Sequence, residues 1–130
     1  MKIPFMKAQG AGNDFIIVDK NVDFIRKSKK VIKRLCDRRF GVGCDQLILI
    51  KKINSYYQIT FYNSDGSLGK NCGNGLRCAY KFLVEVKKVK KAVIKTHKFL
   101  HFGKKTQEEY KINVGEVDRK STRLIQSPCN

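Results

Sequence analysis

One short segment, Cys72-Gly-Asn-Gly-Leu-Arg-Cys78, combines a thiol, a turn of small residues and the start of a predicted helix. The apolar pattern predicts that this helix runs over Leu76 to Val86. A cysteine just before a helix lies near the positive end of the helix dipole, which favours the thiolate. The amides of Gly73 to Gly75 would have no partners inside the helix, and such groups bind carboxylate or phosphate. The segment therefore offers a candidate base beside a candidate anion site, although a buried thiol beside a glycine turn would have the same sequence.

Three further motifs place glycines beside polar side chains: Gly10-Ala-Gly-Asn-Asp-Phe15, Phe40-Gly-Val-Gly-Cys-Asp-Gln-Leu47 and Phe61-Tyr-Asn-Ser-Asp-Gly-Ser67. Together with the segment at Cys72, in this order and at these separations, they resemble the N-terminal half of diaminopimelate epimerase. The resemblance runs from about Met1 to about Asp118. Each motif alone is a weak signal, but the four in register are specific to that family.

The resemblance implies an enzyme that inverts an amino-acid α-carbon without a cofactor or a metal. It converts LL-diaminopimelate into the meso form, a precursor of lysine and peptidoglycan. Two cysteines, one from each of two similar domains, flank the α-carbon in a closed cleft, so that one removes the proton and the other delivers one to the opposite face. Thiols suit this work because their pKa can be tuned towards neutrality. Amides at a helix N-terminus would stabilise the charge that develops on the carboxylate.

Carried over to this sequence, the resemblance assigns Cys72 as the catalytic cysteine, with Gly73 and Asn74 as backbone donors to the α-carboxylate of a small amino-acid substrate. It also assigns three polar substrate contacts whose side-chain amides both donate and accept hydrogen bonds: Asn13, Gln46 and Asn63. The alternative role for these three side chains is hydrogen bonding that stabilises loops. We expect Asp14 and Asp45 to tie loops together rather than to do chemistry.

The elements that must position these residues are predicted to belong to the α+β class, because hairpins outnumber regular βαβ units. The resemblance further implies a mostly antiparallel, curled sheet around a central helix, one half of a two-domain fold. Ser28 is expected to cap a helix that ends near Arg38, and Asn54-Ser55 to form a hairpin turn. Strands are predicted over Lys2 to Ala8, Phe15 to Asp19, Gln46 to Lys51, Tyr56 to Tyr62, Ala92 to Thr96 and Tyr110 to Val114. Residues 1–118 are predicted to form the domain, and residues 119–130 an irregular tail.

The composition limits the classes of partner and compartment. A net charge of +17 invites a nucleic-acid interpretation, but the charge is spread along the chain and no nucleic-acid-binding motif is present, so we expect only nonspecific binding. No apolar run approaches the roughly 20 residues of a membrane span, and no signal-peptide pattern begins the sequence. We therefore expect a cytoplasmic location without membrane association. The five cysteines form no CxxC pair and are expected to be free thiols, with Cys36, Cys44 and Cys78 as small core or near-surface residues.

One feature departs from the family pattern: no second glycine-flanked cysteine motif follows Asp118 in these residues, where the two-domain enzyme would have one. The chain could be a truncated, inactive copy, or one half of an enzyme completed by a second-domain polypeptide. It could also be a separate domain with a binding role, or a homodimer in which two copies face each other. A non-enzymatic basic domain that binds nucleic acid or a partner protein is the alternative from another class. The enzyme interpretation requires a reactive Cys72, whereas the binding interpretation requires a contiguous positive face.

Overall fold

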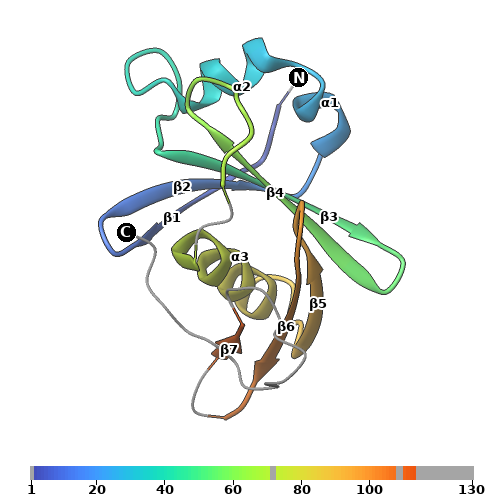
Figure 1. The fold of residues 1–130 in the computed structure, drawn as a ribbon. Helices are drawn as coiled ribbons and strands as arrows, with labels where there is room; N and C mark the ends of the chain where they lie inside the picture. Colours follow the sequence, from blue (N-terminus) through green and yellow to red (C-terminus); the bar gives the residue numbers. More distant parts are fainter. Residues whose placement is uncertain (1, 71–72, 108–109, 114–130) are drawn as a thin grey trace.

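The computed structural model describes residues 2–70, 73–107 and 110–113. Cys72 and the predicted tail at 119–130 lie outside the described residues. Within them, seven strands form one sheet in the order β1-β2-β3-β4-β5-β6-β7, which curls around helix α3 (Figure 1). The strands are β1 (Met6–Gly10), β2 (Asn13–Val18), β3 (Gln46–Ile53), β4 (Tyr56–Asn63), β5 (Lys91–Lys95), β6 (Leu100–Lys105) and β7 (Tyr110–Ile112). The helices are α1 (Val22–Arg26), α2 (Lys29–Cys36) and α3 (Gly73–Glu85).

The strand pairing follows from the connections. Strands joined by short turns pair antiparallel, as β1 does with β2 and β3 with β4, and β5, β6 and β7 continue in the same way. The two parallel pairs, β2 with β3 and β4 with β5, are bridged by helical segments, as a parallel crossover requires. The predicted fold class, an α+β domain with a mostly antiparallel sheet curled around a central helix, is confirmed.

Alternation along β2 shows how the sheet separates two cores. Phe15 and Ile17 pack in the cluster that contains the buried face of α3, whereas Ile16 and Val18 pack with α1 and α2 on the opposite face. All four side chains are nearly inaccessible because both faces of the sheet are covered at this strand.

In the described part of the chain, no helix is long and apolar enough to cross a membrane.

Two elements were not predicted from the sequence. Helix α1 has only five residues, and its N-cap, Asn21, has a left-handed backbone and makes no side-chain capping bond. The buried positions of strand β6 are His101 and Gly103, and neither is an apolar side chain. The alternation of apolar and polar residues therefore does not reveal this strand. Gly103 is required there because an added Cβ would lie 2.5 Å from the ring of Tyr80. Helix α3 also begins earlier than predicted, at Gly73 rather than Leu76.

The inward histidine of β6 is completely buried. Its Nδ1 lies 2.8 Å from the carbonyl oxygen of Asn113, and its Nε2 lies 3.2 Å from Oγ1 of Thr96. Burial lowers the pKa of His101 because the charged imidazolium loses hydration, and the hydrogen bond to Asn113 opposes this only in part. Folding therefore favours the neutral ring.

We expect the free energy of unfolding to fall as the pH drops from 7.5 to 5. In the unfolded chain His101 titrates near its ordinary pKa of about 6.5, so protonation below that pH favours the unfolded state. Urea denaturation of His101→Gln at the two pH values should show a smaller pH dependence than the parent chain. The exposed His97 provides the control, and His97→Gln should retain the full dependence. Equal slopes for all three proteins would contradict this assignment.

Candidate functional site

The first turn of α3 is held tightly against the sheet. Asn74 and Gly75 are buried, and a Cβ added at Gly75 would lie 2.7 Å from the ring of Phe61 on β4. Gly10, at the end of β1, packs against the same turn, with its Cβ position 3.4 Å from Cβ of Asn74. The first four N–H groups of a helix have no partner within it. The turn that the sequence singled out as an anion site is therefore fixed at one end of the sheet, at the point where Cys72 precedes the helix in sequence.

Gln46 and Asn63 lie side by side on β3 and β4. They are direct cross-strand partners, and Nε2 of Gln46 donates to Oδ1 of Asn63 at 3.2 Å. The Asn63 amide nitrogen donates in turn to Oγ of Ser67 at 3.1 Å. The chain then passes closely over this pair at Gly69. A Cβ added there would lie 2.8 Å from Nε2 of Gln46. The loop that leads towards residue 71 thus starts on top of two predicted substrate contacts.

Asn13 lies at the same end of the sheet. It begins β2 opposite Gly10, the residue that contacts the first turn of α3. Two residues later, Phe15 pairs with Gln46. The fold therefore places Asn13, Gln46 and Asn63 at one end of the sheet, where the side chains of Gln46 and Asn63 are joined by a hydrogen bond. Their roles in substrate binding remain predictions.

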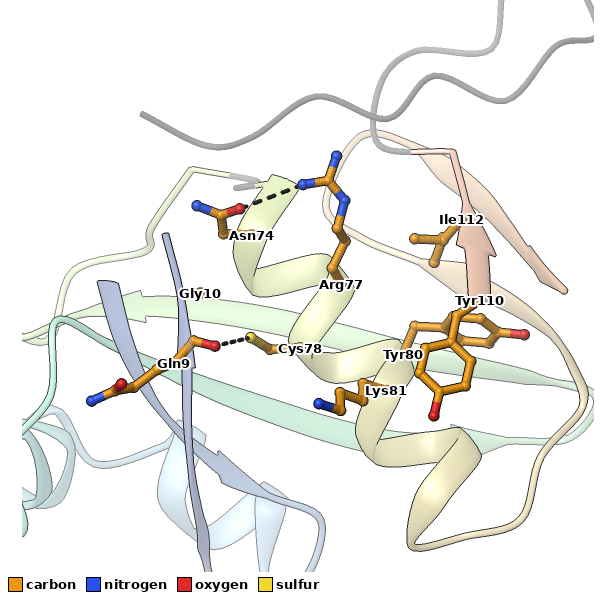
Figure 2. Close-up of a pocket in the computed structure, with 9 residues that line it drawn as sticks. All are labelled: Gln9, Gly10, Asn74, Arg77, Cys78, Tyr80, Lys81, Tyr110 and Ile112. Carbon is orange, nitrogen blue, oxygen red and sulfur yellow. Dashed lines mark hydrogen bonds between the residues drawn. The ribbon is translucent and has the colours of Figure 1, made fainter. Parts of the chain in front are cut away.

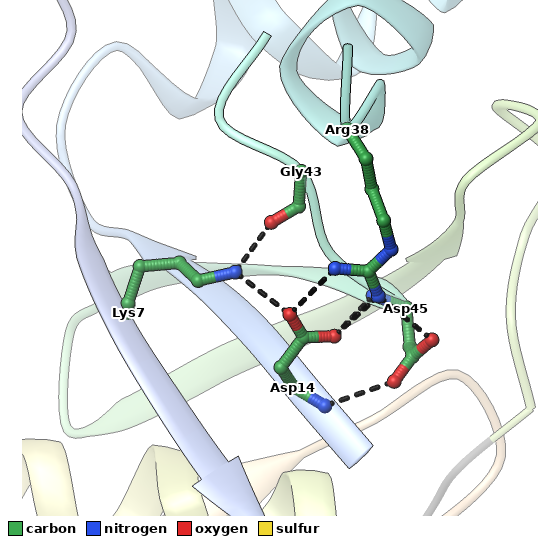
Figure 3. Close-up of polar contacts among 5 residues, drawn as sticks. All are labelled: Lys7, Asp14, Arg38, Gly43 and Asp45. Carbon is green, nitrogen blue, oxygen red and sulfur yellow. Dashed lines mark hydrogen bonds and ion pairs between the residues drawn. The ribbon is translucent and has the colours of Figure 1, made fainter.

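A charged network joins the residues that follow Asn13 and precede Gln46 (Figure 3). The N–H of Asp14 donates to the carboxylate of Asp45 at 3.0 Å, and the N–H of Asp45 donates to the carboxylate of Asp14 at 2.9 Å. The Arg38 guanidinium donates to both carboxylate oxygens of Asp14, at 2.8 and 2.9 Å, and to the carboxylate of Asp45 at 3.1 Å. Lys7 donates to Asp14 at 2.8 Å and to the carbonyl oxygen of Gly43. These contacts tie the starts of β2 and β3 together.

The network is a positioning device rather than a reactive one. The Arg38 guanidinium, and then the Lys7 ammonium, hold the pKa of Asp14 far below its usual range. A carboxylate so strongly stabilised is a poor proton acceptor near neutral pH. The sequence did predict that Asp14 and Asp45 tie loops, but it did not identify Arg38, which lies 24 residues from Asp14.

Replacing Arg38 with alanine should make the amide protons of Asp14 and Asp45 exchange roughly tenfold faster or more. Without the guanidinium, two like charges face each other across the strand starts, and local opening becomes easier. Hydrogen exchange read residue by residue would measure this. Arg39→Ala is the matched control, because Arg39 stacks over the ring of Phe40 at 5.4 Å rather than holding the two carboxylates. Similar exchange in both variants would contradict the assigned role of Arg38.

A pocket of about 230 Å³ lies beside the helix, between α3 and the edge strands β1 and β7 (Figure 2). Its lining includes Gln9, Asn74, Arg77, Cys78 and Lys81. Cys78 lies one turn further along the helix and is half-buried, and its thiol donates to the carbonyl oxygen of Gln9 at 3.6 Å. Burial raises the pKa of the Cys78 thiol, so less of it is present as thiolate near neutral pH. The reactive thiol of the motif is therefore expected to be Cys72.

The chemistry available to this site is anion binding and amide hydrogen bonding. Its described residues offer helix N–H groups, two side-chain amides in contact and a rigid charged support. Among the described residues, no group of three or more His, Cys, Asp or Glu side chains is arranged to hold a metal ion. Such a site fits a small zwitterionic ligand bound by hydrogen bonds.

Comparisons with known proteins identify the family of this chain and similar folds. The family model for diaminopimelate epimerase matches residues 5–119. Diaminopimelate epimerase of Leptospira biflexa is 42% identical over 122 residues, covering 91% of this chain and 44% of the relative. The Rickettsia akari enzyme is 37% identical over 119 residues, covering 89% of this chain and again 44% of the relative. The chain thus spans less than half the length of these curated relatives.

Solved structures show the same fold at low sequence identity. A phenazine biosynthesis protein of the PhzF family from Enterococcus faecalis has a TM-score of 0.64 at 13% identity, covering 85% of this chain and 43% of that one. Methylitaconate-delta-isomerase has a TM-score of 0.63 at 17% identity, covering 95% of this chain and 40% of that one. The motifs, the curled sheet around α3 and the family match over residues 5–119 together show that this chain belongs to the diaminopimelate epimerase family.

Proposed function

We propose that this chain supplies one half of a cofactor-independent, two-thiol inversion of LL-diaminopimelate to the meso form. The observation that supports this most directly is the position of the first turn of α3. That turn follows Cys72 in sequence and lies at the end of the sheet that also carries the paired amides of Gln46 and Asn63.

In this proposal the Cys72 thiolate removes the α-proton from one face of the substrate. The amides of Gly73 and Asn74 receive the negative charge that grows on the α-carboxylate. The side-chain amides of Asn13, Gln46 and Asn63 orient the zwitterionic end of the substrate. A second thiol delivers a proton to the opposite face. Since the 130 residues contain one such cysteine motif, that thiol comes from another domain, another polypeptide or a second copy of the chain.

A chimera tests the proposal. Residues 5–119 of this chain would replace the matching segment of the Leptospira biflexa relative, which keeps the rest of that relative intact. We expect the chimera to incorporate deuterium at the α-carbon of LL-diaminopimelate and to form the meso product. The 130-residue chain alone should not form the meso product, because inversion needs a thiol on each face.

The controls separate failure of folding from failure of function. Circular dichroism and urea denaturation should show that the chimera unfolds cooperatively, like the unmodified relative. A well-folded chimera without exchange activity would contradict the proposal. Turnover by the isolated chain would instead support the two-copy arrangement, and mixing active and Cys72→Ser chains would then lower the activity.

A further inference from the structure

Two cysteines outside the candidate active site meet beneath an exposed loop. Cys36 is the last residue of α2, and Cys44 lies two residues before β3. Between them, residues 37–42 are exposed, whereas both cysteine side chains are 2% exposed. The N–H of Cys44 donates to the carbonyl oxygen of Cys36 at 3.2 Å, so the backbones of the two residues are held together. This loop carries Arg38, the residue that supports the starts of β2 and β3.

The two side chains also belong to the same buried cluster, on the face of the sheet that α1 and α2 cover. Interaction with the Cys44 thiol, and more weakly the charge of Lys7, lower the pKa of Cys36, while interaction with Cys36 and burial raise the pKa of Cys44. Cys36 therefore forms the nucleophilic thiolate more readily than Cys44, whose thiol stays protonated. A disulfide needs neighbouring backbones and side chains on the same side. The backbone hydrogen bond supplies the first condition, and the shared cluster places both thiols on one face of the sheet.

We propose that Cys36 and Cys44 are an oxidation site that closes to an intrachain disulfide across the base of the 37–42 loop. The oxidant is a peroxide, small enough to enter when the exposed loop opens locally. The Cys36 thiolate attacks one peroxide oxygen, which gives a sulfenic acid and releases the other oxygen as water after protonation. The Cys44 thiol then attacks that sulfur, loses its proton and expels a second water. Two thiols and one hydrogen peroxide thus become one disulfide and two waters.

The disulfide would add a covalent tie to a loop that backbone hydrogen bonds already hold. Besides the bond from Cys44 to Cys36, the N–H groups of Val42 and Gly43 both donate to the carbonyl oxygen of Leu35. It would leave the catalytic thiol assigned to Cys72 untouched. The proposal therefore does not depend on the proposed epimerase function, and its test needs no substrate.

The test uses the 130-residue chain with Cys72, Cys78 and Cys129 replaced by serine, so that only the pair remains. After treatment with hydrogen peroxide, trypsin digestion without reductant should yield peptide 35–38 joined to peptide 40–51, lighter by two hydrogen atoms than the separate peptides. Oxidation should raise Tm by roughly 10 °C, because a short loop is closed in the unfolded chain. Dithiothreitol should reverse both changes. The matched control adds Cys36→Ser, which should give neither the joined peptide nor the rise in Tm.

Three results would overturn the proposal. The first is oxidation of Cys36 to a sulfinic acid without a joined peptide. The second is cross-linking that occurs only in urea and not in the folded chain. The third is a joined peptide made of two chains, recognised by a doubled mass of the intact protein before digestion.

Discussion

Replacing Cys72 with serine, in the chimera with the Leptospira biflexa relative, should lower the rate of α-proton exchange by about 10²–10⁴-fold, the range typical of a lost general base. A serine hydroxyl is far less acidic than a thiol, so it does not supply an anionic base near neutral pH. Deuterium incorporation into LL-diaminopimelate measures the loss. The expectation rests on the position of Cys72 directly before the first turn of α3.

Cys78→Ser is the matched control for this prediction. Cys78 lies on the same helix, but burial raises the pKa of its thiol, and it donates a hydrogen bond to Gln9. Its replacement should leave exchange within about threefold of the parent chimera. In the chain itself, with Cys129 replaced by serine, limiting iodoacetamide should label Cys72 before the buried Cys36 and Cys44. Equal losses from the two serine variants would mean that Cys72 has no special role.

Gly41→Ala should lower the free energy of unfolding by about 3 kcal/mol, at the upper end of the cost of inserting atoms into a packed site. An added Cβ would lie 1.7 Å from the carbonyl oxygen of Arg34 and 3.0 Å from that of Asp37. Both neighbours are backbone atoms, so the loop itself must move. Because the loop carries Arg38, this movement should also weaken the network that joins Asp14 and Asp45. Urea denaturation of the 130-residue chain measures the effect.

Gly10→Ala provides the comparison for that substitution. Its Cβ would meet Asn74 and Cys78 at 3.4 Å, an ordinary contact distance. We expect a change below about 1 kcal/mol, since the added methyl displaces nothing. If the two alanine variants were equally stable, the loop after α2 would be more adaptable than its contacts indicate.

The local elements followed closely from the sequence. Ser28 was predicted to cap a helix, and its Oγ accepts from the N–H of Val31 at 3.2 Å. The predicted hairpin turn at Asn54-Ser55 joins β3 and β4, and these two strands pair antiparallel over eight residue pairs. These features depend on residues only a few positions apart, so propensity and pattern are enough to find them. The boundary predicted at residue 118 lies outside the described residues and remains a prediction.

The elements that the sequence did not reveal are those without a recognisable hydrophobic pattern. Strand β6 buries a histidine and a glycine, and their fit depends on Asn113 and on the ring of Tyr80. These partners lie directly after β7 and on α3, far from β6 in the sequence pattern. Hydrophobic periodicity therefore carried no signal there. Helix α1 is too short for its apolar residues to form a recognisable stripe.

For the site, the motifs in the sequence by themselves predicted which residues carry the family chemistry: Cys72, the first-turn amides and the amide side chains of Asn13, Gln46 and Asn63. Only the tertiary structure decided how they are supported. It placed Gln46 against Asn63, closed Arg38 around Asp14 and Asp45, and brought Cys36 to Cys44. These contacts depend on strand order, register and the return of a loop, which set the distance between residues that are far apart in the chain. A sequence motif specifies the chemical group, whereas the packing of the sheet and helices fixes its direction and neighbours.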